Sequence, residues 1–210
     1  TPFQSFNKDL ILLVLIGYIF ALRGRMKALF APKANANVNW GATLLITALT
    51  LYCFNYLPII DFRPACVGCN LLTNTTVPKP DTGLEPLPGY MPFGATCGQD
   101  EFKGATLLIT LKNIDAISID DMEATASLAR DLEGTPVKVM AGTASSSEAI
   151  AHAKQRYGLR FCIHQQDETV LKTMIRSSPG FVLLKEGVVV GQWHINAIPS
   201  KDAVLRRLGK

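Results

Sequence analysis

Residues 38–60 lack any charged residue, although charged residues make up 18% of the chain. An apolar segment of this length can cross a bilayer as a helix. Residues 10–22 also lack charge, but they are short for a span unless Phe3 and Phe6 lengthen it and Lys8 reaches the interface. An interfacial or re-entrant helix is the alternative for this run. The sequence predicts transmembrane helices at about residues 8–23 and 38–60.

The connection between these runs contains no acidic residue, whereas it carries Arg23, Arg25, Lys27 and Lys33. Short loops rich in lysine and arginine stay on the cytoplasmic side of a membrane. Everything after Asp61 is then extracytoplasmic. We expect a multi-pass protein of the cytoplasmic (inner) membrane with a periplasmic carboxyl-terminal domain. Its expected partners are the lipid bilayer and either a protein partner or further transmembrane helices.

The basic excess does not extend into the second part of the chain. Residues 1–64 hold six basic and two acidic residues, whereas residues 65–210 hold 15 of each. A nucleic-acid-binding fold would need a basic patch of its own, so we expect no nucleic-acid partner. The start of the chain shows no basic segment followed by a small-residue cleavage site, so no signal peptide is predicted there.

Three parts are therefore expected: a membrane region over residues 1–64, a linker over 65–104 and a folded domain over 105–210. The linker is rich in proline and glycine, which neither a helix nor a central strand tolerates at this density. We expect an extended extracytoplasmic tether. Asn74-Thr75-Thr76 matches a glycosylation sequon, for which a chance match is the alternative.

Residues 105–210 alternate between strand and helix patterns. Expected strands cover residues 105–112, 136–142, 161–164, 180–184 and 188–193. Ser118 with Asp121 and Ser145 with Glu148 resemble capping boxes that open two of the helices. The order β-α-β-α-β-α-β-β-α predicts an α/β domain with parallel crossovers and a late antiparallel hairpin, a mixed sheet flanked by helices.

This order resembles the thioredoxin fold, and Ser178-Pro179-Gly180 before GFVLLKEGVVVGQW is the most specific match. The resemblance implies a cis-proline at Pro179 and a binding groove beside Pro179 and Ser178. The family's Cys-x-x-Cys would fall between the first strand and its helix, where residues 113–118 contain no cysteine. The usual dithiol reaction, which needs an activated cysteine, is excluded at that place.

A second resemblance rests on three segments, TPFQSFNKDLILLVL, YLPIIDFRP and LKTMIRSSPGFVLLKEGVVVGQWH. Through them the whole chain resembles bacterial DoxX/MauE-like membrane proteins that end in a thioredoxin-like domain. The resemblance covers both apolar runs and most of the domain, and it implies a membrane protein connected with thiol or quinone redox. No cofactor is evident in the sequence, and a quinone is the one that this resemblance suggests for the membrane part.

Five cysteines remain to be placed. Cys66 and Cys69 form a Cys-x-x-Cys pair that can close a disulfide in an oxidising compartment. The pair is a candidate for disulfide exchange, and a structural disulfide or two incidental thiols are the alternatives. Cys53 within the second apolar run and Cys162 on a strand are expected to be packing residues. Cys97 in the linker could pair or remain free.

Recognised metal and nucleotide motifs are missing. His152, His164 and His194 have no neighbouring set of ligands, and Asn70 stands where a c-type haem site would need histidine after Cys69. We predict no metal site. The function expected from the sequence is an accessory role in extracytoplasmic thiol-disulfide or quinone-linked redox, with the domain acting mainly as a docking module. The alternative is a non-catalytic, membrane-anchored binding or scaffold protein.

Overall fold

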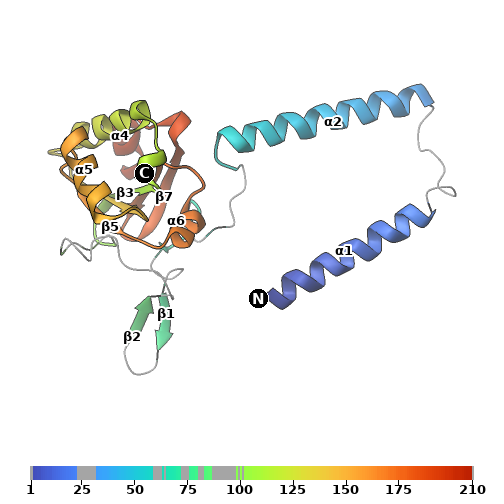
Figure 1. Ribbon diagram of the computed structural model, residues 1–210, viewed down its shortest axis with the longest axis horizontal. Coiled ribbons are helices and arrows are strands. Elements are labelled where there is room, and N and C mark those ends of the chain that lie inside the picture. The colour runs from blue at the N-terminus through green and yellow to red at the C-terminus, as the bar shows by residue number, and fades with distance from the viewer. Residues whose placement is uncertain are drawn as a thin grey trace. The chain divides into compact units, whose positions relative to one another are not determined.

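The computed structural model describes residues 2–22, 32–58, 63, 65–71, 76–79, 83–86, 98, 100 and 102–209. The chain divides into two compact units, residues 1–50 and 51–210, and each is considered by itself (Figure 1). The helices are α1 (Pro2–Leu22), α2 (Pro32–Asn55), α4 (Ile119–Asp131), α5 (Ser147–Tyr157), α6 (Glu168–Met174), α7 (Lys201–Leu208) and the 3-10 turns η2 (Ile114–Ala116) and η3 (Ile195–Ala197). The strands are β1 (Thr76–Lys79), β2 (Gly83–Pro86), β3 (Ala105–Leu111), β4 (Val137–Thr143), β5 (Cys162–Gln165), β6 (Gly180–Lys185) and β7 (Val188–His194).

The two amino-terminal helices differ from the expected transmembrane helices. No helix in the described part of the chain is long and apolar enough to cross a bilayer. The structure therefore does not support the predicted transmembrane helices at residues 8–23 and 38–60. The second helix starts earlier than predicted, so its first turns include Lys33 and several asparagines. It ends at Asn55, and Pro58 follows, which disfavours helical backbone in the residue before it. Leu57 therefore does not extend the helix.

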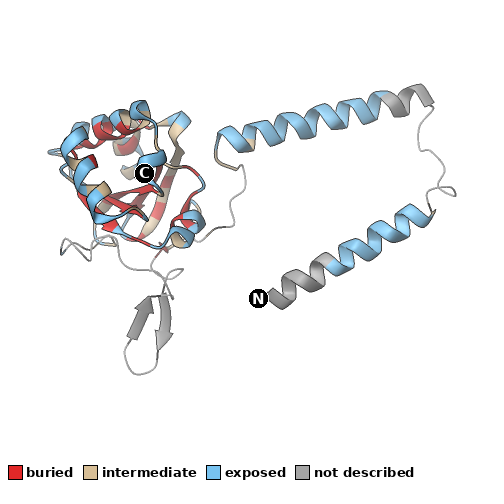
Figure 2. Cartoon of the chain, viewed as in Figure 1, coloured by how far each residue is buried: buried red, intermediate tan, exposed pale blue. Residues whose placement is uncertain are grey.

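Large apolar residues are exposed between Leu10 and Phe20 of α1 and between Val38 and Phe54 of α2. The pale blue colour of these parts of the helices in Figure 2 marks exposed residues. Leu13, Phe20, Leu45 and Phe54 are exposed by 68%, 63%, 70% and 85%. So many exposed large apolar side chains are uncommon on a soluble monomer.

The α/β domain contains a five-stranded sheet in the order β5-β4-β3-β6-β7. β3, β4 and β5 run parallel, whereas β6 pairs antiparallel with both β3 and β7. The predicted succession of parallel crossovers and a final hairpin is confirmed. The domain therefore has the thioredoxin-like fold, a mixed sheet flanked by helices (Figure 1).

Each face of the sheet buries its own apolar cluster, because successive side chains of a strand point to opposite faces. Leu107 and Phe181 belong to the cluster that α4, α5 and α7 cover, whereas Leu108 and Val182 belong to the cluster that α6 covers. All four of these side chains are fully buried. The helices thus lie on both faces, and α6 and α7 lie on opposite ones.

Hydrogen bonds from backbone N–H groups to side chains mark where the helices begin. Ser118 accepts from the backbone of Asp121 at 3.1 Å, as the first predicted capping box requires. The second prediction is off by one residue. Ser146 caps α5 by accepting from Ala149 at 3.3 Å, which leaves the neighbouring Ser145 hydroxyl available for a different bond.

The predicted linker contains a two-stranded antiparallel sheet, β1 with β2. Pro78 and Pro86 lie in these strands. Proline cannot donate to a strand ladder, but each strand of a two-stranded sheet needs only one partner, so an edge position accommodates it. The sequence prediction of an extended tether did not include this pairing.

Gly180, at the start of β6, has no space for a side chain. A Cβ atom there would lie 2.6 Å from Ile175 Cγ2, 2.8 Å from Thr110 Oγ1 and 2.9 Å from the carbonyl oxygen of Ser177. We expect Gly180→Ala to lower the free energy of unfolding by about 1–3 kcal/mol, because the fixed backbone must shift. Urea denaturation measures this change. Gly209→Ala, whose Cβ atom meets only ordinary contacts at 3.8 Å or more, is the matched control and should be nearly neutral.

Candidate functional site

The stretch that would carry the thioredoxin dithiol forms a closed turn without a thiol. The side chain of Asn113 accepts from the backbone of Asp115 at 3.1 Å and so starts η2. Ile114 is buried, and its N–H donates to the Ser145 hydroxyl at 2.9 Å. This bond, which the sequence did not predict, ties the turn to the loop before α5. The turn therefore offers a fixed surface and no nucleophilic sulfur.

The loop between α6 and β6 lies over the carboxyl end of β3. The Ser178–Pro179 peptide bond is cis, the form that the resemblance implied. The Ser178 hydroxyl accepts from the backbone N–H of Lys112 at 3.1 Å. The Ser177 hydroxyl accepts from the backbone of Ile195 at 2.9 Å. These bonds join the two predicted binding residues, Ser178 and Pro179, to the end of β3 and to η3.

Lys112 is the principal charged residue at this end of β3. Its ammonium donates to the carbonyl oxygen of Arg176, which lies in the same loop as Pro179. Burial lowers the pKa of Lys112, and the positive charges of Lys172, Arg63 and Arg176 lower it further. The carboxylate of Glu168 acts in the opposite direction. Lys112 is thus a half-buried cation among mainly like charges.

His194 ends β7 beside Gly180 of β6. Its Nδ1 accepts from the backbone N–H of Asn196 at 3.1 Å and so opens η3. Burial lowers the pKa of His194, and the nearby Lys112 lowers it further, while Asp121 opposes the shift. The neutral imidazole is therefore the favoured form in the folded protein.

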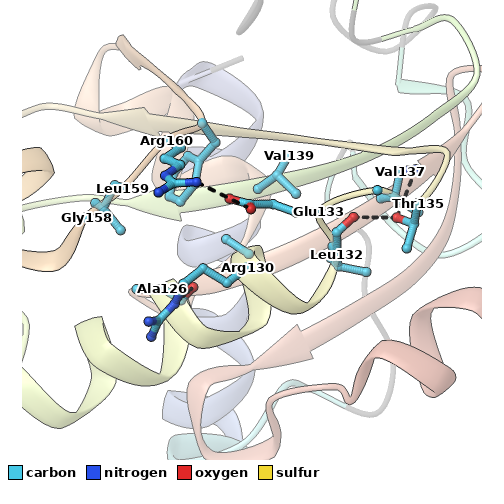
Figure 3. A pocket seen from close by; sticks show the side chains of 13 residues that line it. Ala126, Arg130, Leu132, Glu133, Thr135, Val137, Val139, Gly158, Leu159 and Arg160 are labelled. Atoms are coloured by element: carbon cyan, nitrogen blue, oxygen red, sulfur yellow. Dashed lines mark hydrogen bonds and ion pairs between the residues drawn. The ribbon is translucent and has the colours of Figure 1, made fainter.

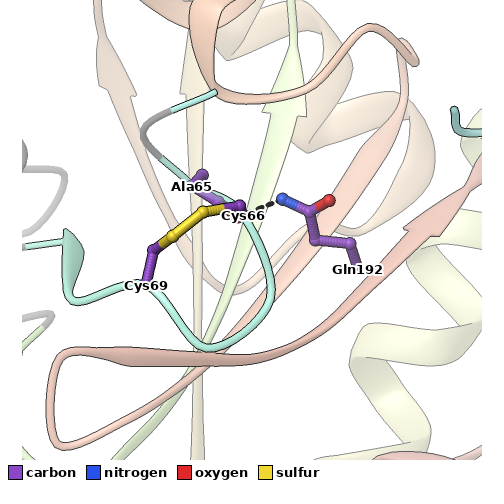
Figure 4. Close-up of a disulfide and its surroundings, with 4 residues drawn as sticks. All are labelled: Ala65, Cys66, Cys69 and Gln192. Carbon is purple, nitrogen blue, oxygen red and sulfur yellow. Dashed lines mark hydrogen bonds between the residues drawn. A yellow bond between two sulfur atoms is a disulfide. The ribbon is translucent and has the colours of Figure 1, made fainter. Parts of the chain in front are cut away.

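Cys66 and Cys69 form a disulfide with a Cα–Cα distance of 5.3 Å, held against the free edge of β7 (Figure 4). The Gly68 N–H donates to the carbonyl oxygen of Val189 at 2.7 Å, and the Val189 N–H donates back to Cys69 at 2.9 Å. Asn70 forms an antiparallel bridge with Val188. The disulfide segment therefore extends the sheet beyond β7.

Side chains reinforce this attachment. Ala65 and Leu71, at the two ends of the segment, are fully buried in the cluster beneath α6. The Gln192 amide donates to the Ala65 carbonyl oxygen, which Figure 4 shows as a dashed line. Residues 65–71 were assigned to the linker from sequence, but here they pack as part of the domain. The two cysteines themselves are half-buried, and Val67 between them is exposed.

The remaining cysteines differ in state. Cys53 in α2 is a free thiol of intermediate exposure. Cys162 at the start of β5 is buried, as predicted, but it is also disulfide-bonded, which the sequence did not indicate at that position. Cys97 lies outside the described residues. The sequence analysis did not use one available signal for a second disulfide: the number of cysteines after residue 60 is even, and this part of the chain was expected to be extracytoplasmic.

The histidines are distributed over the domain. His164 on β5 is buried, whereas His152 on α5 is exposed. Within the described residues, no group of three or more His, Cys, Asp or Glu side chains could hold a metal ion.

A pocket of about 210 Å³ lies between the end of α4 and the segment before β5 (Figure 3). An ion pair of 3.9 Å between Arg160 and Glu133 crosses it, and Val137 and Leu159 contribute apolar walls. Val137 starts β4, so this pocket lies at the amino ends of the parallel strands. Lys112 and Pro179 lie at the opposite end of the sheet. The pocket therefore does not belong to the candidate site.

No family model matches the chain, and no curated protein matches it. Solved structures do match. A proposed thioredoxin of Neisseria meningitidis has 14% identity over 64% of this chain and 84% of its own, with a TM-score of 0.41. A secreted disulfide oxidoreductase of Mycobacterium tuberculosis has 18% identity over 50% of this chain and 81% of its own, with a TM-score of 0.39.

The exposed lipoprotein thioredoxin Etrx1 of Streptococcus pneumoniae strain TIGR4 has 17% identity over 52% of this chain and 86% of its own, with a TM-score of 0.36. These similarities concern the fold alone. The fold assignment rests on the strand order and directions described above, and no residue role is carried over from these proteins.

The lowered pKa of His194 makes the stability of the domain depend on pH. In the unfolded chain this imidazole binds a proton near its ordinary pKa of 6.5, whereas in the folded chain it does so only at lower pH. Its contribution to the free energy of unfolding is therefore complete above pH 6.5 and is lost as pH falls.

We expect His194→Asn, which keeps an acceptor for Asn196 but cannot titrate, to reduce the loss of stability at low pH. Urea midpoints of both proteins across this pH range measure it. An identical slope in both would contradict the assignment.

Proposed function

We propose that this chain is a redox accessory protein that exchanges disulfides with a protein partner through Cys66 and Cys69. The thioredoxin-like domain serves as the docking module. The observation that carries the proposal is the attachment of this Cys-x-x-Cys disulfide to β7, with both cysteines half-buried and Val67 exposed between them. The thiol-free turn at residues 113–118 supports a docking role for the usual site, because it can contact a partner but cannot react with it.

The exchange proceeds by ordinary thiol-disulfide chemistry. A thiolate of the partner attacks one sulfur of the Cys66–Cys69 disulfide, and the other cysteine leaves as a thiolate. A second partner thiolate then attacks the mixed disulfide and releases the first cysteine. The partner dithiol is oxidised to a disulfide, and Cys66 and Cys69 accept two electrons and two protons to become thiols. Reoxidation of Cys66 and Cys69 would require an acceptor of two electrons and two protons, such as a disulfide or a membrane quinone.

Docking is proposed to involve the loop that contains Ser178 and Pro179. The hydrogen bond from Lys112 to Ser178 holds this loop against the end of β3, where it borders the thiol-free turn. A partner segment lying across the loop would contact a preformed surface, which limits the entropy lost on binding. The surface around Pro179 is therefore proposed as the recognition surface, and the Cys66–Cys69 pair as the reacting group.

The domain is proposed to work outside the cytoplasm. Disulfides persist in oxidising compartments and are rare in the cytosol. Cys66, Cys69 and Cys162 are all disulfide-bonded in the folded domain. This supports a periplasmic or otherwise extracytoplasmic location.

A test of the exchange compares the full chain with the variant Cys66→Ser/Cys69→Ser. We expect the unaltered protein to oxidise a dithiol peptide, and the variant to fall to the rate of buffer alone, because the disulfide that remains in it contains the buried Cys162. Reversed-phase separation of alkylated peptide measures the product. Cys53→Ser is the matched control and should keep full activity. If the unaltered chain also fails to react, the domain is a non-catalytic binding or scaffold module.

We also propose that α1 and α2 associate with a lipid bilayer. The support is the exposure of their large apolar side chains, including Leu45, Leu49 and Phe54. Burying these side chains in the acyl region of a membrane would remove apolar surface from water. Lipid contact would place the redox domain near a membrane quinone that could reoxidise Cys66 and Cys69.

Flotation with phosphatidylethanolamine–phosphatidylglycerol vesicles tests the lipid proposal. We expect the full chain to float with the vesicles, and Leu45→Asp/Leu49→Asp to float less because charge is costly to bury in hydrocarbon. Thr47→Asp, which introduces a single charge at a residue that is already polar and exposed, should have a smaller effect. A full chain that remains in the dense fraction would contradict lipid association.

A further inference from the structure

Basic side chains gather where β3 ends and the Pro179 loop begins. Lys112 directly follows β3, and its ammonium donates to the carbonyl oxygen of Arg176. Lys172, in α6, lies four residues before Arg176, and its ammonium is 2.9 Å from the carboxylate of Glu168. Residues from two segments that are far apart in sequence thus form one group of cations.

Nearby acids balance this group only in part. Among the ion pairs of the described residues, Lys172 pairs with Glu168, and neither Lys112 nor Arg176 takes part in one. The guanidinium of Arg63 also lowers the pKa of Lys112, as the charges of Lys172 and Arg176 do. Like charges close together raise the free energy of the unliganded protein. A bound anion would relieve this repulsion.

We infer that the basic cluster formed by Lys112, Lys172 and Arg176 binds carboxylate side chains of an acidic segment on a partner protein. Arginine and lysine both suit carboxylates, arginine through paired hydrogen bonds and lysine through a compact charge. Glu168 interrupts the cluster and Asp167 flanks it. The site therefore presents a few discrete cations, whereas a bilayer surface is recognised by longer runs of basic residues.

Arg63, whose charge acts on Lys112, connects the basic cluster to the disulfide. The Cys66 N–H donates to the carbonyl oxygen of Arg63 at 3.1 Å, so one turn of chain separates the guanidinium-bearing residue from the first sulfur. An acidic segment bound at the cluster would bring neighbouring residues of the same partner towards Cys66 and Cys69. This consequence rests on the proposed exchange function, whereas binding of the acidic segment does not.

Binding should show the features of an electrostatic contact. Exposed charges attract one another over distances that salt shortens, so affinity and association rate should both fall as ionic strength rises. Removing two of the cations should weaken binding and also reduce its dependence on salt. An apolar contact would lack both effects.

Fluorescence anisotropy of a labelled Glu-rich peptide with the detergent-solubilised full chain tests the inference. We expect Lys112→Gln/Arg176→Gln to bind the peptide about tenfold more weakly at low salt. The charge-conserving Lys112→Arg/Arg176→Lys should retain most of the affinity. Arg206→Gln/Arg207→Gln on α7, which covers the opposite face of the sheet, is the matched control and should bind as the unaltered chain does.

Three results would overturn the inference. The first is equal binding of a peptide in which every Glu is Gln, and the second is an equal loss of affinity in the α7 variant. The third is a loss of binding to phosphatidylglycerol vesicles in Lys112→Gln/Arg176→Gln without any change in peptide binding, which would assign the cluster to lipid. Cys66→Ser/Cys69→Ser separates the two proposals, because it should abolish exchange and leave peptide affinity unchanged.

Discussion

Backbone pairing between residues 68–71 and β7 is the contact on which the proposed chemistry depends. Leu71 donates to the carbonyl oxygen of Gly187 at 2.8 Å, and Gly68 and Val189 complete the pairing nearer the disulfide. Burial of Ala65 and Leu71 anchors both ends of the segment. A flexible tether would leave a Cys-x-x-Cys pair without a fixed position relative to the domain. The pairing fixes it and also covers the edge of β7, which would otherwise expose unpaired N–H and C=O groups.

At the carboxyl end of β3, side-chain hydroxyls that accept backbone hydrogen bonds hold the structure together, whereas backbone pairing does so at the disulfide segment. Hydrogen bonds from Ile114 to Ser145 and from Lys112 to Ser178 close the turn and the loop on either side of the strand end. Their partners lie 31 and 66 residues away in sequence. Residues 113–118, where the thioredoxin dithiol would lie, therefore form a closed turn next to the charged side chain of Lys112. In the proposed function, partner binding and disulfide exchange take place at two separate parts of one domain.

Two features show where sequence patterns stop being informative. Ser145 and Ser146 both fit a helix cap, and choosing between them required knowing that the Ile114 N–H needs an acceptor. The charge-free run 38–60 predicted a transmembrane helix, but no helix in the described part of the chain is long and apolar enough to cross a bilayer. The helix starts at Pro32 and ends at Asn55, and these ends depend on backbone constraints that hydropathy does not contain. Composition also led us to assign residues 65–71 to the linker. This segment packs on the domain because it pairs with β7, which lies more than a hundred residues away in the chain, and composition does not reveal such a partner.

The sequence by itself determined the alternation of strands and helices after Ala105, because period-two and period-3.6 apolar patterns follow from local backbone geometry. It also determined that residues 113–118 hold no thiol and that Ser178 and Pro179 precede a strand. Only the tertiary structure decided that the Cys66–Cys69 disulfide segment pairs with β7 and that Lys112 meets Arg176. Both contacts join segments far apart in the chain, and their formation depends on the folded sheet rather than on any local preference.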